Sequence, residues 1–341
     1  MVGPAKPTRR IGAAAFARLL ASDALAEPVI VEGAAAGWPL VAAGERGMRA
    51  AMDYLLRFAS ERPVVCYEAP PELRGRFFYD ETATRMTYQA ARRPLREVLA
   101  DIERAAGEAR APAYYVGSTD AEGFFPGLLA ENPLPLPRGS APASSPTVSL
   151  WIGNRTTACA HFDASHNVAV CAVGRRRFTL FPPAQAANLY PGPLEPTPGG
   201  QVISMVDAGA PDLDAYPRFA EALAAGQVAE LGPGDLLAYP ALWWHQVDAT
   251  CDFNVLVNAW WNPAPGYLDD PWATLLHGML SLRDRPRGEK EAWRALFDYY
   301  VFGEAERPAA HLPEAARGPL APLTESSSRR LRRMVLAKLN R

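Results

Sequence analysis

The segment Thr156–Asp163 contains the residues with the clearest capacity for chemistry, because a histidine and an aspartate stand two positions apart at His161 and Asp163. In a β-strand, residues two apart point to the same face, so both side chains can be directed into the interior of a barrel. The best candidate for a third donor is His245, at the end of the run Pro240–His245. Two histidines and one carboxylate on one face of a metal ion leave three adjacent positions open, which is the arrangement of non-haem iron(II) oxygenases.

A histidine and an aspartate at this spacing are more often an ordinary surface or core pair than metal ligands. The order of the elements strengthens the metal interpretation, since a strand pattern with His161 and Asp163 is followed by further strand patterns, the turn Gly232–Asp235 and then His245. Histidine is also scarce, and two of the five histidines in the chain occupy these positions. We therefore predict that His161, Asp163 and His245 bind one iron(II) ion.

The elements that must position these residues fall into three stretches. Residues 1–108 mix helical and strand patterns and predict an α/β region that packs on a barrel. Residues 109–265 contain short apolar or alternating runs between turn residues, which are typical of an all-β sandwich or barrel. Residues 266–341 have apolar side chains at helical spacing and predict a C-terminal helical extension. The predicted fold class is mainly β with flanking helices.

Composition limits the function classes. Of the 341 residues, 49% are hydrophobic and 21% are charged, which is ordinary for a globular protein. A formal net charge of −2 gives no general reason to expect nucleic acid or an anionic membrane as a partner. No apolar stretch reaches the roughly 20 residues that cross a bilayer. The four cysteines form no CxxC pair, so we expect free thiols and a cytoplasmic location.

The stretch from Trp151 to Trp261 resembles the JmjC/cupin-like oxygenases, in particular the branch that contains the hypoxia-inducible-factor asparaginyl hydroxylase. The shared motifs are His161-Phe-Asp163, Asn167, Gly174, Phe178-Thr-Leu-Phe-Pro-Pro183, Leu189-Tyr-Pro191, Gly232-Pro-Gly-Asp235, Trp243-Trp-His245 and Asn258-Ala-Trp260. The resemblance implies a double-stranded β-helix, which is a cupin or jelly-roll barrel. It also implies iron(II) as the metal and 2-oxoglutarate as the co-substrate.

In this family the keto-acid end of 2-oxoglutarate chelates the iron, and the far carboxylate meets a basic residue. Where the asparaginyl hydroxylase has a lysine, this chain has Arg176, and every lysine of the chain lies outside the barrel segment. A guanidinium can bind a carboxylate through two parallel hydrogen bonds, so Arg176 is the predicted counter-ion. The alternative is that the three arginines 175–177 form a solvated hairpin corner and bind no ligand. Strand alternation favours that alternative for Arg175 and Arg177, and it places Arg176 on the face of Phe178.

The resemblance assigns two asparagines and one tyrosine to the same pocket. Asn167 and Asn258 correspond to asparagines near the co-substrate, with amides satisfied inside the barrel as the alternative. Tyr115 corresponds to a tyrosine that reaches the co-substrate, and the loose register leaves Tyr114 as the alternative.

One position departs from the family pattern. Ala158 stands where the asparaginyl hydroxylase has a threonine whose hydroxyl binds the far carboxylate. We expect Thr157 to compensate, with Thr156 as the alternative.

These assignments predict an iron(II)- and 2-oxoglutarate-dependent dioxygenase that hydroxylates a protein or peptide side chain or a small molecule. One alternative is a cupin enzyme that uses another metal or no 2-oxoglutarate, which Ala158 and Arg176 favour. A non-catalytic binding protein is the second alternative, and the complete donor triad argues against it. The C-terminal apolar stripes permit a homodimer, as the corresponding region of the asparaginyl hydroxylase forms, or an intramolecular core.

Overall fold

The computed structural model describes residues 4–22, 24–136 and 146–340. They divide into two compact units, one within Met1–Pro263 and the other within Ala264–Arg341. Within the described residues, no helix is long and apolar enough to cross a membrane.

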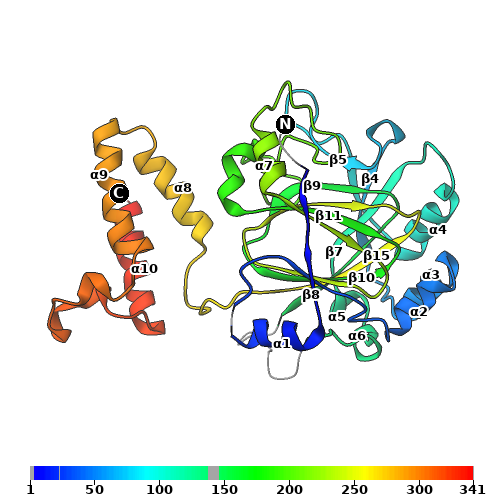
Figure 1. The fold of residues 1–341 in the computed structure, drawn as a ribbon, viewed down its shortest axis with the longest axis horizontal. Helices are drawn as coiled ribbons and strands as arrows, with labels where there is room; N and C mark the ends of the chain where they lie inside the picture. Colours follow the sequence, from blue (N-terminus) through cyan, green and yellow to red (C-terminus); the bar gives the residue numbers. More distant parts are fainter. Residues whose placement is uncertain (1–3, 23, 137–145, 341) are drawn as a thin grey trace. The chain divides into compact units, whose positions relative to one another are not determined.

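The first unit is built on two mixed β-sheets (Figure 1). In order across the six-stranded sheet, the strands are β1 (Lys6–Pro7), β12 (Gln227–Leu231), β11 (Arg176–Phe181), β14 (Trp244–Ala249), β9 (Thr157–Phe162) and β5 (Arg76–Phe77). In order across the nine-stranded sheet, they are β2 (Arg9–Ile11), β3 (Val29–Val31), β13 (Leu236–Tyr239), β10 (His166–Val173), β15 (Asn254–Trp261), β8 (Thr147–Gly153), β7 (Ala113–Asp120), β4 (Val64–Ala69) and β6 (Gln89–Arg93).

Strand β10 shows how the sequence makes the nine-stranded sheet a layer with two buried faces. Val168, Val170 and Ala172 pack into a core formed with helices. Ala169 and Cys171 point the other way, into a second core shared with residues of the six-stranded sheet such as Phe178. Because side chains alternate along a strand, a run that is apolar at every position belongs to a strand covered on both sides.

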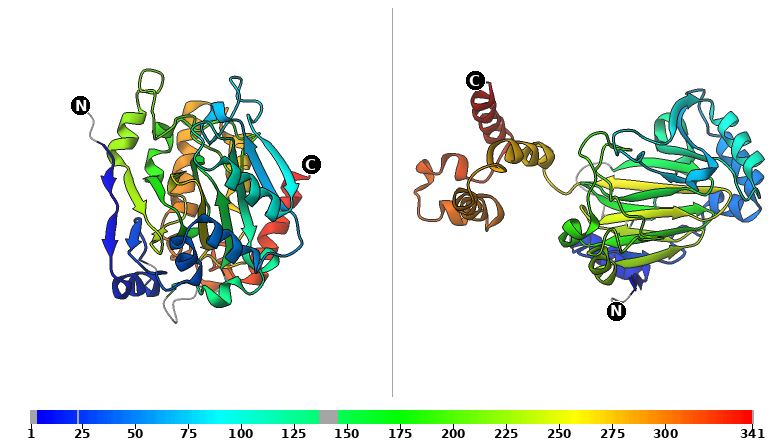
Figure 2. Two further views of the ribbon diagram at one scale, coloured as in Figure 1. Left: turned by 90° about the vertical axis from the view of Figure 1, so that its right-hand side faces the viewer. Right: turned by 90° about the horizontal axis from the view of Figure 1, so that it is seen from above.

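Helices cover the face of the nine-stranded sheet that is turned away from the six-stranded sheet (Figure 2). They are α1 (Ala13–Ala21), α2 (Pro39–Glu45), α3 (Met48–Leu56), α4 (Leu95–Ala105), α5 (Ala121–Phe124) and α6 (Leu128–Glu131). The short elements of this unit are η1 (Pro71–Leu73), η2 (Pro183–Leu189) and α7 (Phe219–Ala225). This arrangement confirms the predicted fold class, a jelly-roll cupin barrel with flanking helices.

The N-terminal region contributes strands to the barrel's own sheet. Strand β3 pairs with β13 at one end of the nine-stranded sheet, while β4 and β6 extend it beyond β7 at the other end. The described residues up to 108 and the barrel strands therefore lie within one compact unit.

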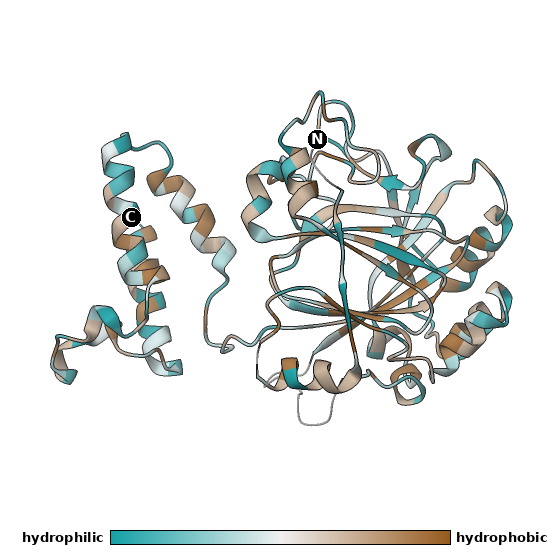
Figure 3. Ribbon diagram, viewed as in Figure 1, coloured by the Kyte–Doolittle hydropathy of each residue, from teal (hydrophilic) through white to brown (hydrophobic). Residues whose placement is uncertain are grey.

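The second unit consists of helices. It contains α8 (Pro271–Leu282), α9 (Arg287–Phe297), η3 (Asp298–Phe302), η4 (Arg307–Ala309), η5 (Glu314–Ala316), η6 (Gly318–Leu320) and α10 (Glu325–Leu339). The carboxylate of Asp270 caps α8 by accepting a hydrogen bond from the backbone N–H of Trp272, and Thr324 begins α10 with a capping box. Figure 3 shows apolar residues along these helices, and many of them are exposed, including Leu280 and Phe302.

Candidate metal centre

Two adjacent strands bring the predicted metal ligands together. Strands β9 and β14 pair in antiparallel fashion with His161 directly opposite His245, and the centroids of the two imidazole rings lie 4.3 Å apart. Asp163 follows the end of β9, where its backbone carbonyl accepts a hydrogen bond of 2.7 Å from the N–H of Leu242. This bond ties the loop after β9 to the segment that leads into His245.

The donor atoms of His161, Asp163 and His245 all lie within 4.8 Å of one another. Nε2 of His245 is 3.7 Å from Oδ2 of Asp163. Within the described part of the chain, no other group of three histidine, cysteine or carboxylate donors is close enough to share a metal ion. Two imidazoles and one carboxylate at such distances suit a divalent transition metal such as iron(II).

Both histidines are held in the tautomer that binds a metal through Nε2. Nδ1 of His161 lies 2.8 Å from the carbonyl oxygen of Cys159, and Nδ1 of His245 lies 2.9 Å from that of Trp243. A carbonyl oxygen only accepts hydrogen bonds, so each Nδ1 carries the proton and each Nε2 presents its lone pair. Burial, followed by the neighbouring His161, lowers the pKa of His245 to about 4, which favours the neutral ligand form.

The Asp163 carboxylate is oriented by a chain of hydrogen bonds. Nδ2 of Asn167 and Nε1 of Trp260 both donate to Oδ2 of Asp163, over 2.7 and 3.2 Å. Nδ2 of Asn258 donates to Oδ1 of Asn167 over 2.9 Å, and Nε1 of Trp151 donates to Oδ1 of Asn258 over 2.5 Å. The chain fixes one carboxylate oxygen, while Oδ1 of Asp163 makes no hydrogen bond to the residues that the structure describes. Asn167 thus contacts Asp163 directly and Asn258 acts on it through Asn167. Both amides are satisfied by these bonds inside the barrel.

A cavity of about 560 Å³ extends from the metal ligands between the two sheets. Arg176, Tyr239 and Asn258 line it and are each less than 5% exposed. Its mouth contains polar residues with more exposure, namely Ser118, Thr147, Ser165 and Gln201. Aromatic rings, including Tyr115 and Trp151 with centroids 5.7 Å apart, form one wall. A concave, mainly apolar site with a few polar groups is typical of small-ligand binding.

Arg176 is buried at this cavity without a carboxylate partner. It is 2% exposed, its Nη2 donates to the carbonyl oxygen of Trp151 over 3.3 Å, and its Nε has no partner among the described residues. Its neighbours Arg175 and Arg177 are exposed, as strand alternation predicts. Burial lowers the pKa of the Arg176 guanidinium. A buried cation without a counter-ion costs on the order of several kcal/mol, so this side chain is suited to receive an anion.

The turn before Arg176 requires a glycine. Gly174 has a φ of 78°, and a Cβ at this position would lie 2.4 Å from Oδ1 of Asn254 and 2.6 Å from the carbonyl oxygen of Phe253. Only glycine combines this backbone conformation with so close an approach. The tight turn starts β11 at Arg176 and thereby directs that side chain between the sheets.

The candidate tyrosines and threonines lie in different places relative to the cavity. Tyr115 lines the cavity, and burial raises the pKa of its phenol to about 12, whereas Tyr114 packs into the core beneath the helices. Ala158 lines the cavity, but neither Thr157 nor Thr156 does. The Thr157 hydroxyl instead donates to Oδ1 of Asp248 over 2.8 Å, so it is not brought together with the other predicted co-substrate residues.

Sequence reasoning missed Tyr239, which lines the cavity from β13. Its ring centroid is 4.8 Å from that of His245, and burial raises the pKa of its hydroxyl well above the ordinary value. The segment Leu236–Tyr239 is one of the short apolar runs from which the sequence predicts only a strand. Alternation along that strand could have placed Tyr239 on the face of Leu237, which points between the two sheets.

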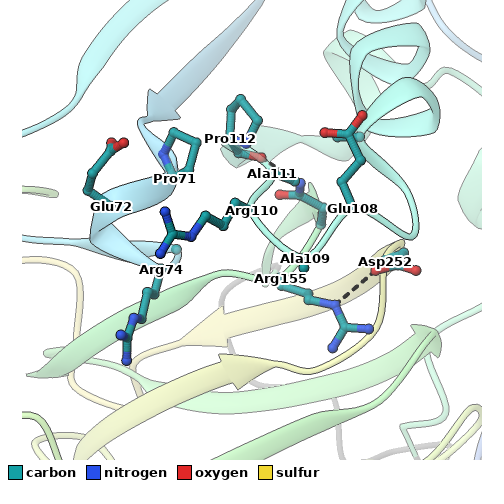
Figure 4. A pocket seen from close by; sticks show the side chains of 13 residues that line it. Pro71, Glu72, Arg74, Glu108, Ala109, Arg110, Ala111, Pro112, Arg155 and Asp252 are labelled. Carbon is teal, nitrogen blue, oxygen red and sulfur yellow. Dashed lines mark hydrogen bonds and ion pairs between the residues drawn. The ribbon is translucent and has the colours of Figure 1, made fainter.

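A second cavity of about 530 Å³ lies apart from the metal ligands (Figure 4). Its charged residues are Arg74, Arg110, Arg155, Glu72, Glu108 and Asp252. Nε of Arg155 donates to Oδ1 of Asp252 over 2.8 Å, and the backbone N–H of Gly107 donates to the other oxygen. The lining of this second cavity has equal numbers of cationic and anionic side chains and contains neither histidine nor cysteine. We therefore assign no reaction to this cavity.

Comparison with protein-family models matches residues 16–267 to the family described as the cupin-like domain. The tRNA wybutosine-synthesizing protein 5 of Mus musculus is 30% identical over 174 residues, which are 51% of this chain and 46% of that protein.

Two further relatives match shorter stretches. The lysine-specific demethylase JMJ31 of Arabidopsis thaliana is 32% identical over 116 residues, 34% of this chain and 21% of that protein. The HSPB1-associated protein 1 of Homo sapiens is 35% identical over 115 residues, 33% of this chain and 23% of that protein. The matches thus span less than half the length of each of these three relatives.

Proposed function

Because the chain belongs to the cupin-like domain family, we propose that it is an iron(II)- and 2-oxoglutarate-dependent dioxygenase that hydroxylates its substrate. When bound, the metal and co-substrate would supply oxidation by dioxygen, in which 2-oxoglutarate gives succinate and carbon dioxide while a substrate C–H bond gains an oxygen atom. The substrate would be a protein or peptide side chain or a small molecule.

One observation carries this proposal. His161, Asp163 and His245 open onto the same cavity as Arg176, a buried cation with no carboxylate partner among the described residues. The donor set suits iron(II), and the guanidinium suits the far carboxylate of a dicarboxylic keto acid. A metal site without a co-substrate would leave the buried charge of Arg176 unexplained.

The residues around the donors would prepare the site before any ligand binds. The bonds from Nδ1 of His161 and His245 to backbone carbonyls hold each Nε2 ready for the metal. Asn167 and Trp260 restrain the Asp163 carboxylate. Such outer contacts fix ligand orientation and raise metal affinity.

The cavity walls would bind and orient the co-substrate. Arg176 would pair with the far carboxylate, and Tyr115 would lie beside it. Asn258 would be held in place at the cavity wall by its hydrogen bonds to Trp151 and Asn167. Apolar side chains between the two ends, such as that of Val247, would keep bulk water from the reacting atoms.

The prime substrate would enter at the mouth of the cavity. Ser118, Thr147, Ser165 and Gln201 offer hydrogen bonds there without a charged group. Two relatives carry names that refer to different substrates, lysine in one and tRNA in the other. The family therefore does not fix the substrate, and a net charge of −2 makes a polypeptide or small molecule the better proposal than nucleic acid.

A binding and turnover experiment tests the proposal. Calorimetric titration of the iron(II)-loaded protein with 2-oxoglutarate in the absence of oxygen should give saturable binding, and admission of oxygen with a substrate should release succinate. If the iron-loaded protein does not bind 2-oxoglutarate, the proposal is rejected in favour of a cupin enzyme that works without it. If the protein binds neither iron nor 2-oxoglutarate, a non-catalytic binding protein is the remaining interpretation.

We also propose that the helical unit joins two copies of the chain. Of its described residues, only Pro308, Ala309 and Ser328 are buried, whereas Leu280 and Phe302 are 82% and 75% exposed. A helical segment of this size without a core of its own needs a partner to cover its apolar side chains. A second copy offers the same apolar surface in return.

A cytoplasmic location completes the proposal. Cys66, Cys159, Cys171 and Cys251 are all free thiols. Thiols stay reduced in the cytoplasm.

A further inference from the structure

Tyr239 is a buried residue of the cavity, and the proposed chemistry gives its hydroxyl no role. It ends β13 in the nine-stranded sheet and is 3% exposed. Its ring centroid lies 4.8 Å from that of His245 and 6.3 Å from that of Phe178, both of which belong to the six-stranded sheet. The side chain therefore reaches across the barrel beside the metal candidate.

The hydroxyl of Tyr239 makes no hydrogen bond to any residue that the structure describes. Buried phenols ordinarily find a polar partner, because an unpaired hydroxyl loses its bonds to water without compensation. Tyr239 lines the cavity. Its hydroxyl is therefore available to a bound ligand rather than to the surrounding protein.

Apart from the metal-ligand atoms of His161, Asp163 and His245, the unengaged polar groups in the buried part of the cavity are hydrogen-bond donors. Nε of Arg176 is buried and has no partner among the described residues. Tyr115 and Tyr239 line the same cavity, and their hydroxyls make no hydrogen bond to the described residues. A guanidinium has no acceptor atom, and a phenol at neutral pH carries a proton to donate. The amide of Asn258 is already engaged on both sides, by Trp151 and Asn167. A group with several acceptor lone pairs and one negative charge, which is a carboxylate, fits this set.

We propose that Tyr239 donates a hydrogen bond to the far carboxylate of a 2-oxo dicarboxylic acid, together with Arg176 and Tyr115. This inference rests on the proposed function, because it requires that the cavity take 2-oxoglutarate. It makes Tyr239 a residue that determines co-substrate specificity. A keto acid without the far carboxylate would leave buried donors unpaired, and sites that bind a polar group discriminate strongly against analogues that lack it.

Anaerobic calorimetric titrations of the iron(II)-loaded protein test the inference with two ligands. The first is 2-oxoglutarate, and the second is 2-oxopentanoate, which has the same carbon chain without the far carboxylate. Tyr239→Phe removes only the hydroxyl, and Tyr79→Phe is the matched control, since Tyr79 is buried but does not line the cavity. We expect Tyr239→Phe to weaken 2-oxoglutarate binding by about tenfold or more and to leave 2-oxopentanoate binding unchanged. Tyr79→Phe should leave both affinities unchanged.

The outcomes separate this inference from the proposed function. If Tyr239→Phe binds 2-oxoglutarate as tightly as the wild type, the inference alone is overturned. An equal loss of affinity for both keto acids would also overturn it, because Tyr239 would then act only by supporting His245. If the iron-loaded wild type binds no 2-oxoglutarate, the proposed function and the inference both fail. Should Tyr239→Phe not fold, as judged by circular dichroism, Tyr239→Met makes the same comparison.

Discussion

Nδ2 of Asn167 donates a 2.7 Å hydrogen bond to Oδ2 of Asp163, so that one oxygen of the candidate metal-binding carboxylate is fixed by an amide from β10. Asn167 is fully buried and receives a hydrogen bond from Asn258 in turn. The position of Asp163 therefore depends on two strands of the sheet opposite to the one that carries His161 and His245.

Replacement of Asn167 should weaken metal binding without removing a ligand. We expect Asn167→Ala to lower iron(II) affinity by about tenfold to a hundredfold, because outer contacts of this kind orient metal-binding side chains. Anaerobic titration with iron(II) measures the change. Asn188→Ala is the control, since Asn188 contacts Gln185 in η2, outside the cavity. An unchanged affinity in Asn167→Ala would show that Asp163 is positioned without the amide.

Arg176 should determine the affinity for the co-substrate. Arg176→Gln removes the buried charge, and we expect the dissociation constant for 2-oxoglutarate to rise by about tenfold to a hundredfold while iron affinity is retained. Arg177→Gln is the matched control, because Arg177 is exposed and pairs with Glu230 on the surface. If both variants bind 2-oxoglutarate as tightly as the wild type, Arg176 is not the counter-ion.

Tyr115 and its neighbour Tyr114 should behave differently. Tyr115→Phe removes a hydroxyl at the cavity wall and should weaken 2-oxoglutarate binding several-fold, since hydrogen bonds to charged groups are among the stronger ones. Tyr114→Phe lies on the opposite face of β7 and should leave binding unchanged. Equilibrium binding to both variants checks this. The reverse order of effects would mean that the register of β7 is displaced by one residue.

The exposed apolar residues of the helical unit should control the oligomeric state. We expect the wild type to have twice the chain mass of 37.0 kDa in light scattering. Leu280→Glu together with Phe302→Glu should give the single-chain mass, because buried carboxylates oppose association. Leu213→Glu, at an exposed leucine of the first unit, is the control and should remain a dimer. A wild-type monomer at tens of micromolar would contradict the dimer proposal.

Much of the fold was predictable because the sequence records it locally. The short apolar runs, the Gly232–Asp235 turn and the order of His161, Asp163 and His245 indicate a barrel with a metal site, and the match to the cupin-like domain family confirms the predicted family. Alternation in β11 was enough to place Arg176 inside and its neighbours outside. The barrel and the direction of Arg176 follow from the period of a strand and the order of elements along the chain, whereas the family prediction rests on the resemblance of the motifs.

What the sequence did not reveal depends on contacts between distant strands. Thr157 was expected to face the co-substrate, but β9 pairs with β14 so that Thr157 stands opposite Asp248, and its hydroxyl binds that carboxylate. The chain of hydrogen bonds from Trp151 through Asn258 to Asn167 crosses three neighbouring strands. Tyr239 lay in a run whose composition predicts only a buried strand. Spacing along one chain does not encode these pairings.

The most direct test of the account is an iron(II) titration that compares the wild type with His161→Ala, Asp163→Ala and His245→Ala. His311→Ala is the control, because His311 is an exposed histidine of the second unit. The account predicts one iron ion per chain in the wild type and in His311→Ala, and at least a hundredfold weaker binding in each ligand variant, with all variants folded by circular dichroism. Equal iron binding by the wild type and the three ligand variants would contradict the assignment of His161, Asp163 and His245 as the metal site.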